Sequence, residues 1–156
     1  MKQLYNIAEV KLSYKTNPAK SPKVQINNSA DCYDVLIDNW DEGELEHKES
    51  LKVLLLNQNN IVLGIYTAAE GGIAGISVDV RVVLQAAILA NASSIVLAHN
   101  HPSGNLKPSH QDIDMTKWMI EGASVVNIRV YDHIIVCKDK YFSFADKGLL
   151  YKGISK

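Results

Sequence analysis

The segment from residue 94 to residue 112 constrains this chain more than any other part of its sequence. It opens with a short apolar run, SIVLA, that predicts a buried strand, and this run ends directly in the polar string HNHPSG. Because side chains alternate between the two faces of a strand, the H-x-H pair places the imidazoles of His99 and His101 on the same side. The strand therefore presents two potential ligands at its end.

The turn after this strand returns a carboxylate to the two histidines. Gly104 and Pro108 let the chain turn sharply, and a helix is expected to open at Pro108–Ser109 and run to about Gly122. The first turn of that helix carries Asp112. Two neutral imidazoles and one carboxylate, with a fourth position open, are a ligand set typical of catalytic zinc. Water in the open position has its pKa lowered to about 7, which supplies hydroxide at neutral pH.

Each of these residues also has a simpler interpretation. A single histidine is more often structural than a ligand, and H-x-H pairs arise frequently by chance. Ser109-x-x-Asp112 matches a helix capping box, and taken alone this interpretation is the preferred one. Asn100, Pro102 and Gly104 could simply shape a turn. The joint occurrence of strand end, H-x-H, turn and helix start favours the metal site.

The rest of the chain predicts an α/β sandwich around one sheet, with mixed strand directions. Strands and helices alternate without an internal repeat. The expected elements are a strand over 4–14, a loop over 16–23, a helix from Ser29 to about Trp40, a hairpin of strands 49–56 and 61–68 around NQNN, a helix capped by Ser77 or Asp79 and running to Ala92, and strands over 127–137 and 141–144. The helix ending at Ala92 is apolar nearly all round and is therefore expected to be buried.

Composition excludes several classes of protein. The chain has 156 residues, is 47% hydrophobic and carries a formal net charge of −1, which supports one folded domain rather than a disordered chain. No apolar run is long enough for a membrane span, and no signal peptide is evident, so a cytoplasmic protein is expected. Its only arginines are Arg81 and Arg129, and this near-neutral balance gives no support for nucleic-acid binding. Cys32 and Cys137 are expected to be reduced, packed thiols.

A family resemblance rests on the motif itself. The spacing H-x-H-x7-S-x2-D matches the JAMM (JAB/MPN) metalloprotease motif, and AHNHPSG…PS…D followed by Asp132-His133-Ile-Ile resembles the RadC family. The resemblance covers roughly residues 30–150. It implies a single JAMM/MPN-like domain over 29–156, with a mixed sheet flanked by helices in α-β-α layers similar to those of cytidine deaminases. Residues 1–28 are a strand or arm to which it assigns no role.

The resemblance also implies roles for individual residues. His99, His101 and Asp112 would bind one Zn2+ ion, and Ser109 would donate a hydrogen bond to the developing oxyanion. The family places a glutamate before an apolar strand, which selects Glu49 as general base. The neighbouring acidic residues, which could equally be solvated charges, are Glu42, Glu44 and Glu46.

Asp132 and His133 could orient a ligand histidine or form a packed structural pair. The other polar residues near the motif are expected to lie away from the metal: His47, His110 and Asp114. The loops over 70–75 and 103–108 are candidates for setting substrate specificity.

The leading functional prediction is a zinc-dependent hydrolase of the JAMM type, acting on a peptide or isopeptide bond of a peptide or protein substrate. The alternative is a RadC-like module without catalytic activity, or one associated with DNA repair, that binds nucleic acid or a protein partner. The family name alone suggests a role with DNA. Phosphoester hydrolysis ranks lower because it commonly uses two metals, whereas this motif offers ligands for one. The sequence does not predict the oligomeric state.

Overall fold

The fold is a single mixed sheet with helices on both faces. The computed structural model describes residues 23–72 and 75–150, and within these ranges no helix is both long and apolar enough to cross a membrane. The elements, in chain order, are α1 (Ser29–Asp38), α2 (Glu42–Leu45), β1 (Ser50–Leu56), β2 (Val62–Glu70), α3 (Val80–Leu89), β3 (Ser94–Asn100), α4 (His110–Val125), β4 (Arg129–Val136) and β5 (Tyr141–Ser143).

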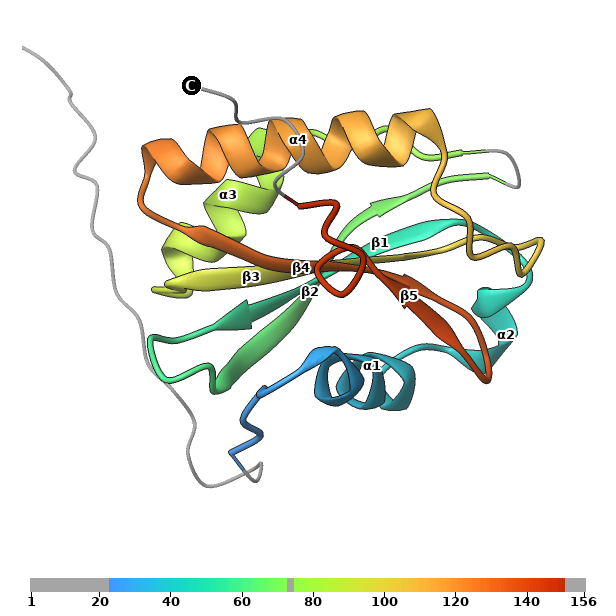
Figure 1. Ribbon diagram of the computed structural model, residues 1–156, viewed down its shortest axis with the longest axis horizontal. Coiled ribbons are helices and arrows are strands. Elements are labelled where there is room, and N and C mark those ends of the chain that lie inside the picture. Colours follow the sequence, from blue (N-terminus) through green and yellow to red (C-terminus); the bar gives the residue numbers. More distant parts are fainter. Residues whose placement is uncertain (1–22, 73–74, 151–156) are drawn as a thin grey trace, which may run out of the picture.

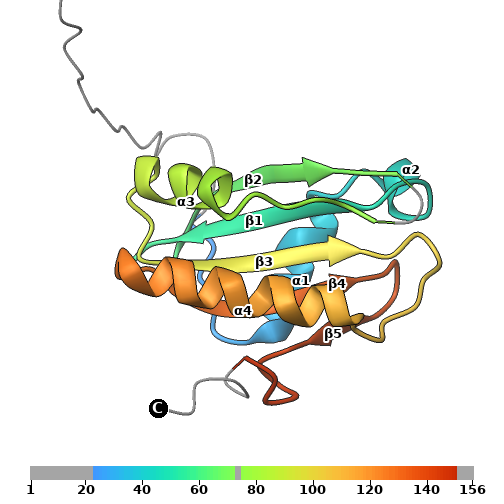
Figure 2. The same ribbon diagram turned by 90° about the horizontal axis from the view of Figure 1, so that it is seen from above.

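The five strands lie in the order β2-β1-β3-β4-β5, which Figure 2 shows from above. Only β3 and β4 are parallel, and α4 provides the crossover that a parallel pair requires. The other neighbours are antiparallel. The structure thus confirms the predicted α/β sandwich with mixed strand directions.

Helices α3 and α4 cover one face of the sheet, and α1 covers the other (Figure 1). Each face has its own apolar cluster: Leu51, Val83 and Met119 belong to the first, and Leu36 and Leu54 to the second. The inner strand β3 contacts both clusters and is buried along its whole length. Because it is covered on both faces, its end is a rigid place to hold side chains.

Helix α1 begins and ends differently from its prediction. Its N-cap is Asn28, whose side chain accepts a hydrogen bond from the backbone N–H of Asp31, so the predicted cap, Ser29, is the first helical residue. The Ser29 hydroxyl instead donates to Asp146 at 2.6 Å, which ties α1 to the segment that follows β5. The helix stops at Asp38, and Trp40 packs into the core just beyond it.

Helix α3 is less buried than its composition suggested. Asp79, one of the two predicted caps, is the N-cap. Val83 and Ala87 are buried, but Ile88 and Leu89 are 49% and 60% exposed, so the prediction of a buried helix was wrong for its last turn. The helix also ends at Leu89, because the chain turns there to enter β3.

Helix α4 continues three residues beyond its predicted end at Gly122, to Val125. A glycine usually signals a helix end, but here it permits close packing between helices. A Cβ atom at Gly122 would lie 3.0 Å from Cγ1 of Val80 on α3. The absence of a side chain at this position lets the two helices approach.

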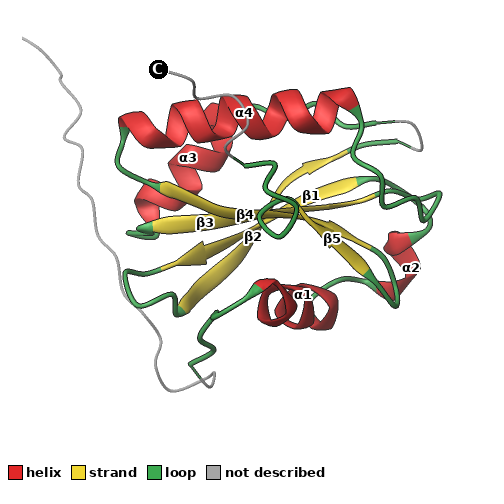
Figure 3. Cartoon of the chain, viewed as in Figure 1, coloured by secondary structure: helices red, strands yellow, loops and turns green. Residues whose placement is uncertain are grey.

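Three further predictions concern the remaining segments. The Asn-rich hairpin between β1 and β2 is confirmed (Figure 3). Asn60, in its turn, has φ 55°. Cys32 is a buried free thiol, and burial raises its pKa to about 12, while Cys137 is partly buried and also free. The strand expected over residues 4–14, and all but the last residue of the loop over 16–23, lie outside the described residues.

Candidate metal centre

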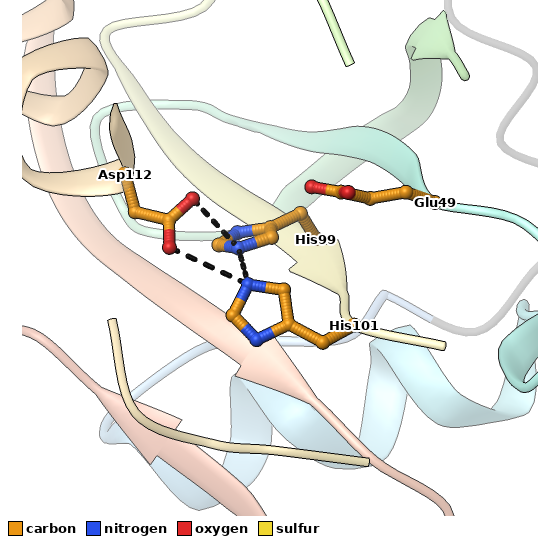
Figure 4. Close-up of side chains that lie close together, drawn as sticks. All are labelled: Glu49, His99, His101 and Asp112. Atoms are coloured by element: carbon orange, nitrogen blue, oxygen red, sulfur yellow. Dashed lines mark hydrogen bonds and ion pairs between the residues drawn. The ribbon is translucent and has the colours of Figure 1, made fainter. Parts of the chain in front are cut away.

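The end of β3 carries the two histidines of the motif. His99 is 1% exposed and lies within the strand, and His101 follows directly after it. As the alternation of strand side chains predicts, both rings lie on one side, with their Nε2 atoms 2.9 Å apart (Figure 4). The two nitrogens face the same point in space.

Asp112 approaches these nitrogens from the first turn of α4. Its Oδ1 lies 3.1 Å from His99 Nε2, and its Oδ2 lies 3.4 Å from His101 Nε2 (Figure 4). The same carboxylate forms a capping box with Ser109: Asp112 Oδ2 accepts from the Ser109 backbone N–H at 2.6 Å, and Ser109 Oγ accepts from the Asp112 N–H at 3.1 Å. The capping interpretation and the ligand interpretation therefore describe one arrangement.

Glu49 completes the cluster from the residue before β1. It is 9% exposed, and its backbone is held at the end of β2 by two hydrogen bonds with Gly71 and Gly72. One ligand atom from each of Glu49, His99, His101 and Asp112 can be chosen so that all lie within 4.8 Å of one another. Of the neighbouring acids, Glu42 and Glu44 pair with lysines, and only Glu46 also reaches the cleft. The structure thus distinguishes Glu49 from the rest of the acidic run.

The donor set fits a tetrahedral divalent cation. Nδ1 of His101 lies 2.6 Å from the carbonyl oxygen of Asn105, which can only accept, so this nitrogen carries a proton and Nε2 is the one free to bind a metal. A zinc ion with ligand bonds of about 2.0–2.1 Å separates its ligand atoms by about 3.3 Å. The observed separations of 2.9, 3.1 and 3.4 Å among the two histidines and Asp112 bracket that value.

Burial and mutual contacts set the charges in the cluster. Burial raises the pKa of the Glu49 carboxyl, and the two histidines partly oppose this. Burial also disfavours ionised Asp112, but the contacts with His101 and His99 outweigh it and hold the pKa of Asp112 well below its usual range. The same contact with Asp112 raises the pKa of His101. The pKa of Glu49 is therefore raised while that of Asp112 is lowered. A raised pKa suits a group that exchanges protons, and a lowered pKa suits a group that stays ionised to bind a metal.

A cleft of about 450 Å³ opens over this cluster. Its walls include Ser109 and Met115 of the α4 region, Pro102 and Ser103 of the loop after β3, and Gly75. Both predicted specificity loops thus contribute described residues to the cleft. A second hollow of about 270 Å³ shares part of this wall and extends along α4 to Trp118.

The remaining predicted residues fall into two groups. His47, His110 and Asp114 are exposed, as expected. Asp132 and His133 are both buried, but they differ in role. Asp132 accepts hydrogen bonds from Ser143 Oγ at 2.6 Å and the Ala145 N–H at 2.9 Å, which are contacts within the β4–β5 region. The ring of His133, in contrast, contacts His99.

The sequence did not predict the contacts of two residues around the site, Asn100 and Thr116. Asn100 was considered only as a turn residue, yet it is fully buried in β3 and its side-chain amide binds the segment that precedes β1. A polar residue between the two histidines of the motif, at the end of a buried strand, was the available signal. Thr116, four residues after Asp112, contacts the ring of His133 and gave no signal beyond its helical spacing.

Fold and site together define a class of protein: an α/β domain with a candidate metal centre at one end of its sheet, built from two histidines and two carboxylates. Comparison with protein families agrees. The model of the RadC-like JAB domain matches residues 26–149, and the chain belongs to this family. The resemblance inferred from the motif is thereby confirmed.

Similar proteins carry names without a stated activity. A UPF0758 protein of Porphyromonas gingivalis is 44% identical over 104 residues, which are 66% of this chain and 46% of that protein. One of Salinibacter ruber is 39% identical over 121 residues, 78% of this chain and 49% of the relative. One of Clostridium beijerinckii is 34% identical over 148 residues, 95% of this chain and 63% of the relative. The chain thus spans about half the length of the first two relatives.

Proposed function

We propose that this domain is a zinc-dependent hydrolase of the JAMM type, which uses water to cleave a peptide or isopeptide bond. One observation carries the proposal: the Glu49 carboxylate lines the same cleft as three potential metal ligands and lies within 4.8 Å of them. A purely structural zinc site closes its coordination with protein ligands and has no use for an acid–base group in an accessible cleft.

The roles of the residues follow from their positions. His99, His101 and Asp112 would hold the ion, which when bound supplies a Lewis acid and activates water for attack. Glu49 takes a proton from the attacking water and transfers it to the nitrogen of the leaving amine as the C–N bond breaks. The raised pKa of Glu49 suits both steps, because it brings the carboxyl closer to neutral pH.

Ser109 supplies the remaining polar group. Its Oγ already accepts a hydrogen bond from the Asp112 N–H, so the hydroxyl proton is directed elsewhere. Ser109 also lines the cleft, where this proton can be donated to the oxyanion that develops on the substrate carbonyl. We prefer an amide substrate over a phosphodiester, because the motif offers ligands for one ion and phosphodiester hydrolysis commonly uses two.

The test combines metal analysis with turnover. Purified protein is reconstituted with zinc, its metal content is measured, and a peptide library that includes isopeptide-linked lysines is searched for cleavage. Glu49→Gln should retain zinc and lose at least about a hundredfold in turnover, the usual contribution of a general base. Glu46→Gln is the matched control, since Glu46 borders the same cleft but lies outside the cluster.

Failure to bind zinc after reconstitution would end the proposal. Zinc binding without hydrolysis in either the wild type or Glu46→Gln would favour a module without catalytic activity. Salt-dependent binding to a mixed DNA duplex separates a nucleic-acid role from a protein-binding one.

A further inference from the structure

We propose that His133 and Thr116 are positioning residues that fix the tautomer of His99, so that its Nε2 always presents a lone pair to the metal. This inference depends on the metal site proposed above. It concerns a chain of hydrogen bonds that joins three elements: β3, β4 and α4.

The contacts form a continuous line behind the site. His99 Nδ1 lies 2.8 Å from His133 Nε2, His133 Nδ1 lies 2.6 Å from Thr116 Oγ1, and Thr116 Oγ1 lies 2.6 Å from the backbone carbonyl oxygen of Asp112. All the side chains in this line are at most 2% exposed. The line begins at one proposed ligand and ends at the backbone of another.

The direction of every hydrogen bond in this line follows from the one between Thr116 and the backbone carbonyl of Asp112. The Asp112 carbonyl can only accept, so the single hydroxyl proton of Thr116 is donated to it. Thr116 Oγ1 must then accept from His133, which places a proton on His133 Nδ1. A doubly protonated His133 would be a buried cation, and none of its described hydrogen-bond partners is a carboxylate that could balance it. His133 Nε2 therefore carries a lone pair.

The position of the ring proton on neutral His99 follows from that of His133. Its Nδ1 must donate to His133 Nε2, so the lone pair of the neutral His99 imidazole is on Nε2. That Nε2 faces Asp112 Oδ1 at 3.1 Å. Two acceptors at this distance repel each other unless a cation lies between them. This line of hydrogen bonds, the His99–His133–Thr116 relay, thus leaves a lone pair beside a carboxylate, an arrangement that a bound cation stabilises. Fixing the tautomer is a common role of the partners of metal-bound histidines.

A purely structural role is the alternative. The ring of His133 is stacked on Phe144 with a centroid separation of 4.5 Å, as a packed core histidine would be. The two roles differ in what they predict when the relay is cut without removing the ring. Thr116→Val does this, because valine keeps the shape of threonine and has no hydroxyl. Thr116→Ser keeps the hydroxyl and should restore the relay.

The decisive measurement is ring 15N NMR of His99 in the metal-free protein, assigned with a His99→Gln variant. The wild type and Thr116→Ser should show the Nδ1-protonated tautomer, and Thr116→Val should show a mixture of tautomers. In parallel, zinc affinity measured by chelator competition should fall about 10–100-fold in Thr116→Val and His133→Phe. Asp132→Asn is the control for general destabilisation, because Asp132 accepts from the backbone N–H of His133 at 2.7 Å and does not contact its ring in the relay. It should lower the melting temperature and leave zinc affinity unchanged.

An unaltered His99 tautomer in folded Thr116→Val would overturn the inference, as would a loss of zinc affinity in Asp132→Asn equal to that in Thr116→Val. The NMR measurement needs neither metal nor substrate. It therefore decides the relay even if the wild type fails to bind zinc, an outcome that would refute the proposed function.

Discussion

The carboxylate of Asp112 accepts a hydrogen bond from the backbone N–H of Ser109 at 2.6 Å while its two oxygens face the histidine nitrogens. One side chain thus fixes the start of α4 and supplies a candidate ligand. The helix cannot begin at a different residue without moving the carboxylate. This coupling explains why a capping box and a metal motif share the same two residues.

The first prediction separates these two roles. Asp112→Asn keeps an oxygen that can accept from the Ser109 N–H, so we expect the protein to fold but to lose measurable zinc binding, because the ligand charge is gone. Ser109→Ala removes the capping hydroxyl and leaves the three proposed ligands in place. It should lower the free energy of unfolding by about 1 kcal/mol and retain zinc. Urea denaturation and metal analysis of both variants check this. Equal zinc retention in the two variants would exclude Asp112 as a ligand.

The second prediction concerns the turn between the two halves of the motif. Gly104 has φ 71°, a left-handed conformation, and its N–H donates to the carbonyl of His101 at 2.8 Å. This turn brings the Asn105 carbonyl to His101 Nδ1. Gly104→Ala should cost about 1–2 kcal/mol in stability and weaken zinc binding, because the strained turn no longer holds the imidazole. Gly148→Ala is the control: it also replaces a glycine at positive φ, and it should affect stability only.

The sequence was most informative where local chemistry decides the structure. Strand alternation and the spacing from His101 to Asp112 were enough to place three side chains around one point. Glu49 was different, because nothing local distinguishes it from Glu42, Glu44 and Glu46. Its position depends on β1 pairing with β3, in which Leu51 lies opposite His99. Only the family resemblance could supply that long-range information in advance.

Burial was harder to predict than site geometry. Composition indicated a fully buried α3, yet its last turn is exposed because the sheet and α4 cover only one side of the helix. Likewise, Asn100 and Thr116 look unremarkable in the sequence. Their importance comes from partners 50 residues and 17 residues away in the chain. Such contacts follow from tertiary structure, which overrides local propensity.

The third prediction tests whether Asn100 links strand β3, which carries His99, to Glu49, the proposed general base. Its Oδ1 accepts from the Ser50 N–H at 2.9 Å, and its Nδ2 donates to the carbonyls of Leu45 and Lys48 at 2.7 and 2.9 Å. Asn100→Ala leaves these backbone groups without their partner, at a cost of about 1–3 kcal/mol for each group that stays buried and unsatisfied. We therefore expect a large fall in melting temperature.

Asn100→Asp is the sharper variant of the same test. A carboxylate can still accept from Ser50, but it places negative charge against the carbonyl oxygens of Leu45 and Lys48. If Asn100 positions Glu49, this variant, once folded, should retain zinc and lose turnover, as Glu49→Gln does. Full turnover in a folded Asn100→Asp protein would contradict the link.

The last prediction is a change in pH dependence on adding metal. In the metal-free protein, the contact with Asp112 raises the pKa of His101 above 6.5, and the histidine contacts lower the pKa of Asp112 below 3.8. Because its pKa is raised in the folded state, His101 stabilises the fold fully below pH 6.5, and this contribution is lost as pH rises through its folded pKa. Because its pKa is lowered in the folded state, Asp112 contributes stability above pH 3.8, and this contribution is lost as pH falls through its folded pKa.

The metal-free protein should therefore gain most from this pair between about pH 3.8 and 6.5. Zinc must displace the proton from His101, so its affinity should rise with pH through this range and beyond. Melting temperatures measured from pH 4 to 8, with zinc and with a chelator, should diverge increasingly toward high pH. In His101→Gln the two curves should coincide, because the protein has lost one of the proposed ligands and no longer binds zinc. A zinc-induced rise in melting temperature that is the same at every pH would show that the metal binds without displacing this proton.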